Sequence, residues 1–296
     1  MVIQERQARG EGVSWVPQAD APDEERLRHW VERLAVPRHM HANARNNARV
    51  REQVATALRH CGFEVRLQGR YRNIVALSPT PERPLVAVAA HYDSVPHCPG
   101  ADDNASGLAA MLECARVLAA SGRAGSMAFL AFNAEEDQLA GSRDFVANGM
   151  KELPRPITLV HVLEMVGFRS AAAPPEKLPF PWTPASLKVP DFIGLIAKGP
   201  SNQAASRAAT SSAAPGLHVA AAKTWGPLHR WFPDLARSDH FPFWSEGLPA
   251  LLWTDTGNFR NPNYHRASDR PNTLDYRFMR EVTELLCSVV SEEAAP

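Results

Sequence analysis

Two short apolar runs, Leu85–Ala90 and Met127–Phe132, stand out in the hydrophobic pattern of the chain. Each has the length of a buried strand and is bounded by turn-forming residues. Between them, Ala105–Ala120 carries apolar side chains at helical spacing. The pattern predicts a strand–helix–strand unit, in which the two strands lie parallel in one sheet.

The same period-two and helical patterns predict the remaining elements. Further strands are expected at Phe63–Gln68, Asn73–Leu77, Thr158–Glu164, Asp191–Ala197, Leu217–Ala222 and Pro249–Asp255. Further helices are expected at Glu24–Leu34, Ala42–Cys61, Leu139–Met150, Asn202–Ser212 and Asp275–Val290. This order of elements predicts an α/β fold, a three-layer αβα sandwich whose mixed, mainly parallel central sheet is flanked by helices.

Two segments lack a regular pattern. Residues 1–23 are polar and aperiodic, which predicts an N-terminal tail or a loosely docked arm. Residues from about 169 to 190 are rich in proline and too long for a simple connection, so they form either a functional loop over a crevice or a disordered insert. Phe180, Trp182 and Leu187 favour the loop because they give it apolar side chains to bury.

Composition narrows the classes of partner. The 296 residues carry no formal net charge and have a pI of about 7.2, which argues against nucleic acid or an anionic membrane. No apolar run reaches membrane-spanning length, and the N-terminus lacks the apolar core of a signal peptide. A cytoplasmic location is therefore expected unless a leader has been removed. The four cysteines are expected to be reduced and buried, although Cys98 could face a metal.

Acidic and imidazole side chains gather at the ends of the predicted strands and at the start of the helix: His91, Asp93, Asp102, Asp103, Glu135 and Glu136. In an open α/β sheet these strand ends share one crevice. Two carboxylates about 4 Å apart repel by roughly 4 kcal/mol at an effective dielectric constant near 20, so a cation is needed among them. Residues 85–136 contain no run of Lys or Arg, and carboxylates with imidazole suit zinc, so the segment predicts a metal site.

Each cluster alone has an ordinary structural explanation. A histidine after a strand is more often a satisfied structural residue than a ligand, and one of the tandem aspartates could be a helix N-cap. Paired glutamates could be surface charges. The joint pattern favours the metal site, because every polar cluster, including those at Glu164 and His265, follows or precedes a strand end.

The chain also contains, in order, the motifs HYDS, GADDNASG, FNAEED, LEMVG, SDH and NPNYHRASDRPNTLDY. In sequence and spacing it resembles the co-catalytic zinc aminopeptidase family of the bacterial leucyl aminopeptidase type, a superfamily that includes glutamate carboxypeptidase and glutaminyl cyclase. The match runs from about Leu85 to the C-terminal helix. It implies that residues 24–296 form a single zinc-peptidase catalytic domain.

The resemblance implies two zinc ions per chain and five ligands. Asp103 would bridge both ions, with His91 and Glu164 completing one site and Glu136 and His265 the other. Family members usually have aspartate where this chain has Glu164, and they have a cis peptide bond at the position of Asp103 and Asn104.

The resemblance also implies catalytic roles for three residues. Glu135 would be the general base, Asp93 would orient the ligand His91, and Tyr264 would steady the oxyanion. Two of these roles agree with general chemistry. An Asp two residues along a strand lies on the same face as His91, and a base need not bind the metal.

The function expected is that of a zinc-dependent exopeptidase. It would be an aminopeptidase that uses water held by two zinc ions to hydrolyse a peptide or aminoacyl substrate with a free N-terminus. One alternative is a glutaminyl-cyclase-like transferase with a single zinc. Another is a metallo-carboxypeptidase of the same fold, in which Arg237, Arg260 or Arg266 could bind a terminal carboxylate. A non-catalytic domain is disfavoured because all of the implied ligands are present.

Several features remain open in the sequence. Asp239 in the SDH motif is expected to organise a loop or face the substrate, and His97 and His240 are expected to be structural. A group of aromatic residues could form either core or the wall of a substrate pocket: Trp225, Trp231, Phe232, Phe241, Phe243 and Trp244. The preferred substrate side chain and the oligomeric state are not predicted.

Overall fold

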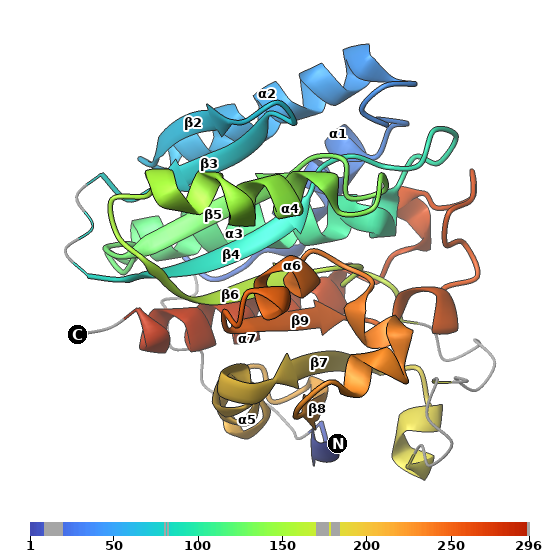
Figure 1. The fold of residues 1–296 in the computed structure, drawn as a ribbon. Coiled ribbons are helices and arrows are strands. Elements are labelled where there is room, and N and C mark those ends of the chain that lie inside the picture. The colour runs from blue at the N-terminus through green and yellow to red at the C-terminus, as the bar shows by residue number, and fades with distance from the viewer. Residues whose placement is uncertain (9–19, 80, 82, 170–177, 179–183, 295–296) are drawn as a thin grey trace.

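A mixed sheet runs through the middle of the molecule (Figure 1). The computed structural model describes residues 1–8, 20–79, 81, 83–169, 178 and 184–294. Within these residues the strands are β1 (Val2–Arg6), β2 (Glu64–Gln68), β3 (Asn73–Leu77), β4 (Leu85–His91), β5 (Met127–Phe132), β6 (Ile157–Leu163), β7 (Phe192–Lys198), β8 (His218–Thr224) and β9 (Ala250–Thr254).

The strand order across the sheet is β1-β8-β7-β9-β6-β4-β5-β3-β2. The central strands β5, β4, β6 and β9 are parallel to one another. Strand β7 is antiparallel to β9 and parallel to β8, while β1 with β8, β3 with β5, and β2 with β3 are antiparallel pairs. The prediction of a mixed sheet with a parallel centre is confirmed.

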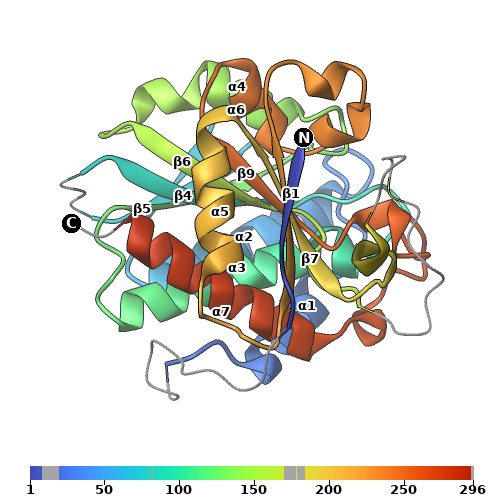
Figure 2. The same cartoon turned by 90° about the horizontal axis from the view of Figure 1, so that it is seen from below.

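Helices cover both faces of the sheet (Figure 2). The described helices are α1 (Glu24–Leu34), α2 (Ala44–His60), α3 (Gly107–Ala120), α4 (Ala140–Ala147), α5 (Asn202–Thr210), α6 (His240–Ser245) and α7 (Tyr276–Glu293). Helices α1, α2, α3, α5 and α7 form the layer on one face, and α4 and α6 lie on the other. The predicted three-layer αβα sandwich is confirmed.

Strand β4 shows why the central strands read as continuous apolar runs. Its residues alternate between the two faces, so that Val86 and Val88 belong to the core beneath α3, whereas Ala87 and Ala89 belong to the core beneath α4 and α6. Because helices cover both faces, neither face of β4 can be polar, and all seven of its residues are buried.

The predicted N-terminal tail is wrong for its first residues. Val2–Arg6 forms the edge strand β1, which pairs with β8. The Arg6 guanidinium also donates hydrogen bonds to main-chain carbonyl groups, among them those of Ala213 and Ala214. A five-residue segment with three polar side chains carries little pattern of its own, and the pairing with a distant strand determines its structure. Residues 9–19 lie outside the described part.

Two of the predicted helices differ in form from expectation. An irregular helical turn, η1 (Ala101–Ser106), precedes α3, and the helix expected over Leu139–Met150 divides into α4 and the short turn η2 (Gly149–Glu152). In the proline-rich segment, Phe180 and Trp182 lie outside the described residues. Leu187 is buried against Phe192 and Ala220, as expected for a segment with apolar contacts.

No helix in the described ranges combines the length and the apolarity needed to cross a bilayer. The cytoplasmic location stays a prediction.

Candidate metal centre

The central strands of the sheet run parallel (Figure 1), and the predicted site residues lie at or after their carboxyl ends. His91 is the last residue of β4, Glu164 directly follows β6, and Glu135 and Glu136 lie in the loop after β5. His265 lies in the long loop after β9. Because β5, β4, β6 and β9 run in the same direction, their carboxyl ends open on one crevice.

Five of the predicted residues form two groups joined by Asp103. In one group, His91 Nε2 lies 3.2 Å from Asp103 Oδ1 and 3.4 Å from Glu164 Oε2. In the other, His265 Nε2 lies 3.1 Å from Asp103 Oδ2 and 3.2 Å from Glu136 Oε2. In each group, one ligand atom from every residue lies within 4.8 Å of the others. Asp103 thus directs one oxygen to each group.

The donor atoms of the first group fit a cation. The side chain of His91 is fully buried, yet neither ring nitrogen forms a hydrogen bond of acceptable geometry, although carboxylate oxygens lie within 3.5 Å. A buried polar group without a hydrogen bond is rare and needs an explanation. A divalent ion between His91 Nε2 and the carboxylates of Asp103 and Glu164 would give Nε2 a partner, and the mixed His and carboxylate set suits zinc.

The clustered carboxyl groups have altered proton affinities. Burial raises the pKa of Glu135 well above its ordinary value, and the nearby charge of Glu164 raises it further. Burial and the charge of Asp103 raise the pKa of Glu136 to about 7. Burial opposes the charged form of His265, but its hydrogen bonds to Asp103 and Glu136 raise its pKa to about 10. The cluster therefore attracts positive charge, whether protons or metal ions.

Asp93 contacts both His91 and the loop after β5 that carries Glu135 and Glu136. Its Oδ1 lies 3.4 Å from His91 Nδ1, on the side expected of an orienting carboxylate, but not in hydrogen-bond geometry. The two oxygens of Asp93 instead accept hydrogen bonds from the backbone N–H groups of Glu135 and Glu136. Asp93 therefore fixes the loop that presents these two glutamates.

The turn η1 is held by contacts with two other segments. Asp269 accepts hydrogen bonds from the backbone N–H groups of Asp102 and Asp103, and burial raises its pKa to about 7. Asn104 donates from its side chain to the Leu163 carbonyl and accepts from Met165 N–H. The peptide bond between Asp103 and Asn104 is cis, as the family resemblance implies.

Arg38 is a buried cation that sequence reasoning did not place near the site. Its guanidinium donates hydrogen bonds to the carbonyl groups of Val36, Tyr92, Pro99 and Gly100. These bonds connect the segment after α1 with the segment after β4. The contacts join residues far apart in sequence, so no local pattern could reveal them. Asp269 was missed for the same reason, although it lies within the last of the recognised motifs.

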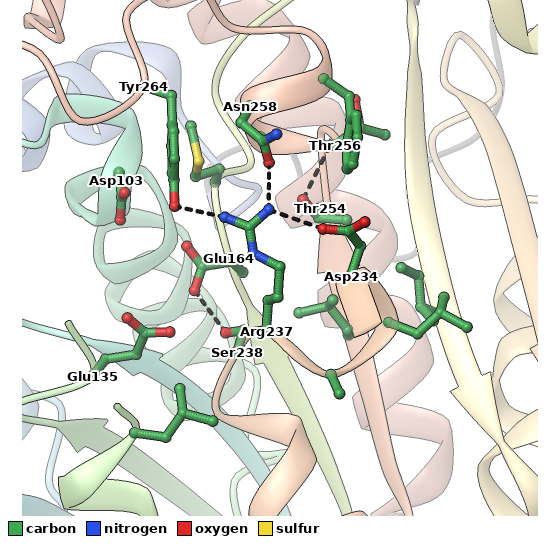
Figure 3. Close-up of a pocket in the computed structure, with 18 of the residues that line it drawn as sticks. Asp103, Glu135, Glu164, Asp234, Arg237, Ser238, Thr254, Thr256, Asn258 and Tyr264 are labelled. Atoms are coloured by element: carbon green, nitrogen blue, oxygen red, sulfur yellow. Dashed lines mark hydrogen bonds and ion pairs between the residues drawn. The ribbon is translucent and has the colours of Figure 1, made fainter. Parts of the chain in front are cut away.

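Tyr264 and Arg237 border the cleft together (Figure 3). Arg237 donates a hydrogen bond of 3.1 Å to the Tyr264 hydroxyl and also contacts Asp234 and Asn258. Burial and the charge of Asp103 raise the pKa of Tyr264. The phenol therefore keeps its proton, and because Arg237 occupies a lone pair of its oxygen, the hydroxyl hydrogen is free to donate elsewhere.

The two groups open into a cavity of about 420 Å³. Glu135, which belongs to neither group, lines this cavity with Tyr264 and Arg237. The remaining wall contains several apolar side chains: Leu139, Met165, Leu178, Ile196, Leu235, Leu252 and Phe259. The cleft therefore combines a charged end with a largely apolar recess, which is the usual construction of a small-molecule site.

Other candidates from the sequence lie outside the cavity. Cys98 directs its thiol to the Arg266 carbonyl and Asp269, and burial raises its pKa to about 12. Asp239 is fully buried rather than facing the cavity. Arg260 donates to the carbonyl groups of Phe168 and Phe192 and is structural.

The aromatic group does not form the pocket wall. Phe243 and Trp244 are buried in the core on the face of α4 and α6, whereas Trp225 and Trp231 are exposed by 54% and 69%. In the described part of the chain, the aromatic side chains that line the cavity are Phe259 and Tyr264.

Comparison with known proteins agrees with this geometry. Residues 73–290 match the model of peptidase family M28. The chain is 32% identical over 229 residues to the uncharacterized protein YfbL of Escherichia coli, a match that covers 73% of this chain and 69% of YfbL. It is 31% identical over 212 residues to the aminopeptidase YwaD of Bacillus subtilis, covering 70% of this chain and 41% of YwaD.

The fold is similar to that of a solved structure, BSAP, described as a zinc aminopeptidase from Bacillus subtilis. The TM-score is 0.55 at 27% identity, covering 75% of this chain and 50% of BSAP. This chain thus spans half or less of the length of YwaD and BSAP.

The chain belongs to peptidase family M28, because the family model covers most of its length. The resemblance inferred from the motifs is confirmed, and so is the expectation of an enzyme that hydrolyses peptide bonds.

Proposed function

We propose that this enzyme is a zinc-dependent aminopeptidase that removes residues from the free N-terminus of peptide or aminoacyl substrates. The observation that carries the proposal is the pair of donor groups that share Asp103, with Glu135 beside them and outside both. The relatives named aminopeptidases and the zinc aminopeptidase BSAP support the metal and the reaction.

The proposal assigns one zinc ion to each donor group. His91, Asp103 and Glu164 would hold one ion, and Asp103, Glu136 and His265 the other. Glu164 replaces the usual aspartate, and its Oε2 accepts a hydrogen bond of 2.6 Å from Ser238, which holds the longer side chain toward His91 (Figure 3). When bound, the zinc ions would supply Lewis acidity, which lowers the pKa of a water molecule and polarises the scissile carbonyl group.

Glu135 is assigned the proton transfers. Its carboxylate lines the cavity beside the donor groups, and burial raises its pKa, which increases its affinity for a proton. It would remove a proton from the attacking water and deliver that proton to the nitrogen of the leaving amine. Asp93 would support this step by fixing the backbone of the loop.

Tyr264 is assigned to the carbonyl oxygen of the substrate. Its hydroxyl faces the cavity, and Arg237 donates to its oxygen, which polarises the phenol. Donation from Tyr264 to the oxygen that gains negative charge would stabilise the transition state.

The alternatives explain less of this arrangement. A single-zinc transferase would use one donor group and would need no hydrolytic water, whereas this chain assembles two groups and a separate carboxylate base. Carboxypeptidase action has no support from the names of YwaD and BSAP.

The apolar wall formed by Met165, Ile196 and Leu252 would accept an apolar side chain of the N-terminal residue.

Metal analysis tests the proposal directly. We expect about two zinc ions per chain in the purified enzyme and about one in His265→Ala, because that substitution removes a ligand that only one site uses. His97→Ala is a matched control, since His97 is exposed and lies in neither donor group. Two ions retained by His265→Ala would contradict the ligand assignment.

Substrate direction is measured with the same preparations. Leucine p-nitroanilide should be hydrolysed and its N-acetyl derivative should not. Cleavage of the blocked compound at a similar rate would exclude an aminopeptidase.

A further inference from the structure

A second hollow adjoins the catalytic cavity. It has a volume of about 580 Å³, and Gln138 and Arg143 line both hollows. Its other side includes Arg70 and Tyr71, which follow β2. The two hollows therefore adjoin at Gln138 and Arg143, and Arg70 lines the second of them.

The proposed reaction fixes which part of a substrate points this way. Glu135 delivers its proton to the leaving amine, so that nitrogen must lie beside Glu135. The apolar wall for the N-terminal side chain is built mainly from β6, β7, β9 and the segments that follow them. The loop from Glu135 to the first turn of α4, which carries Gln138 and Arg143, is therefore on the side of the leaving group.

Arg143 brings an unneutralised positive charge to the junction. Its Nε donates to the Gln138 carbonyl, and among the described residues no carboxylate lies within ion-pair distance of its guanidinium. The second hollow is also lined by two acidic side chains, Asp137 and Asp144, whose described contacts are with residues other than Arg143. Asp144 accepts hydrogen bonds from Gln68 and Asn148, and Asp137 lies 3.4 Å from His39 Nε2.

Arg70 adds a second guanidinium on the far side of the hollow. It donates a hydrogen bond of 2.6 Å to the Tyr71 hydroxyl and packs over the Tyr71 ring, 4.7 Å from its centroid. No ion pair holds it within the described part of the chain either. Arg143, which lines both hollows, and Arg70, which lines the second, are therefore two cations available to an anionic group on the leaving product.

We propose that Arg143, assisted by Arg70, binds the C-terminal carboxylate of a short peptide, so that the enzyme prefers dipeptides and tripeptides with free carboxylates. This inference rests on the proposed aminopeptidase function. In an extended peptide each residue spans at most about 3.6 Å, so the carboxylate of such a substrate stays within about two residues of the leaving nitrogen. The planar guanidinium of Arg matches a carboxylate with two parallel hydrogen bonds.

The test compares free acids with their amides. We expect kcat/KM for Leu-Ala or Leu-Ala-Ala to exceed that for its C-terminal amide by about 10-fold or more, as a charge-assisted contact provides. In Arg143→Gln this ratio should fall to about 1, chiefly because KM for the acid rises. Arg143→Lys should retain part of the preference, since lysine keeps the positive charge but lacks the planar guanidinium that can donate two parallel hydrogen bonds.

Arg277→Gln is the control, because Arg277 is exposed on α7 and, among the residues that the structure describes, pairs with Glu281 on its own helix. It should keep the wild-type ratio. Equal kcat/KM for acid and amide at both lengths in the wild type, or an unchanged ratio in a folded Arg143→Gln, would overturn the proposal. Hydrolysis of leucine p-nitroanilide, which has no carboxylate, separates this result from a failure of the aminopeptidase function itself.

Discussion

The side chains around Asp103 divide into groups suited to hold a cation and a group suited to move a proton. Each histidine, His91 or His265, approaches one oxygen of Asp103. Glu164 lies beside His91, and Glu136 lies beside His265. Glu135 belongs to neither donor group. Glu135 and Glu136 are adjacent in sequence and equal in chemistry, so their different roles depend only on where the loop after β5 directs them.

Replacement of Glu135 by Gln separates the two roles. The change removes the proposed proton acceptor but no proposed ligand, so zinc content should stay near two per chain while kcat falls by about 10²–10⁴-fold. Elemental analysis and the rate with leucine p-nitroanilide measure these quantities. The matched change Glu136→Gln should instead lower the zinc content. Turnover retained by Glu135→Gln would remove Glu135 from the mechanism.

Among the elements, η1 and α3 meet in a closely packed junction near the site. Gly107 begins α3, and a Cβ atom at this position would collide with the Asn104 side chain and approach the Leu163 carbonyl at 3.0 Å. Asn104 connects η1 to the end of β6 through Leu163 and Met165. Glycine at 107 therefore allows the turn that presents Asp103 to lie directly against the strand that presents Glu164.

Gly107→Ala should displace this turn. We expect a loss of about 1–3 kcal/mol in the free energy of unfolding, as for other overpacked sites, together with weaker zinc binding because Asp103 moves. Urea denaturation and zinc titration are the measurements. Gly125→Ala is a suitable control, since a Cβ atom at Gly125 would have no other atom within 4 Å and the φ of this residue is not positive. Similar zinc affinity in both variants would show that the close packing at Gly107 does not position Asp103.

The same junction marks the limit of prediction from sequence. The strands Asn73–Leu77 and Met127–Phe132 and the helix Glu24–Leu34 have the predicted bounds, because burial and amphipathic spacing are local properties. The irregular turn before α3 was not predicted. Its shape depends on a hydrogen bond that Asp269 accepts from the Asp102 N–H and one that Asn104 donates to the Leu163 carbonyl, and no sequence periodicity reveals these contacts.

On the scale of the whole molecule, parallel strands at the sheet centre determine where the site forms. The sequence predicted the convergence of His91, Asp103, Glu136, Glu164 and His265 because strand ends can be located from apolar runs, and the structure brings all five together. It did not predict β1, whose pairing with β8 joins residues more than two hundred positions apart. Arg143 of α4 was also missed, because the cavity that it lines is assembled mostly from segments distant in sequence.

The buried charge of Arg38 bears on whether the enzyme stays folded when its metal is removed. Burial lowers its pKa, but arginine retains its proton in proteins, and its guanidinium holds four carbonyl groups around the loops of the site. That fixed charge would stay in place after chelation. We expect a metal-stripped sample to keep its native circular dichroism spectrum and to regain full turnover when zinc is returned without refolding. Cobalt could then replace zinc in the metal-free enzyme as a spectroscopic reporter. Irreversible precipitation when the metal is removed would show that Arg38 alone cannot preserve the fold around the site.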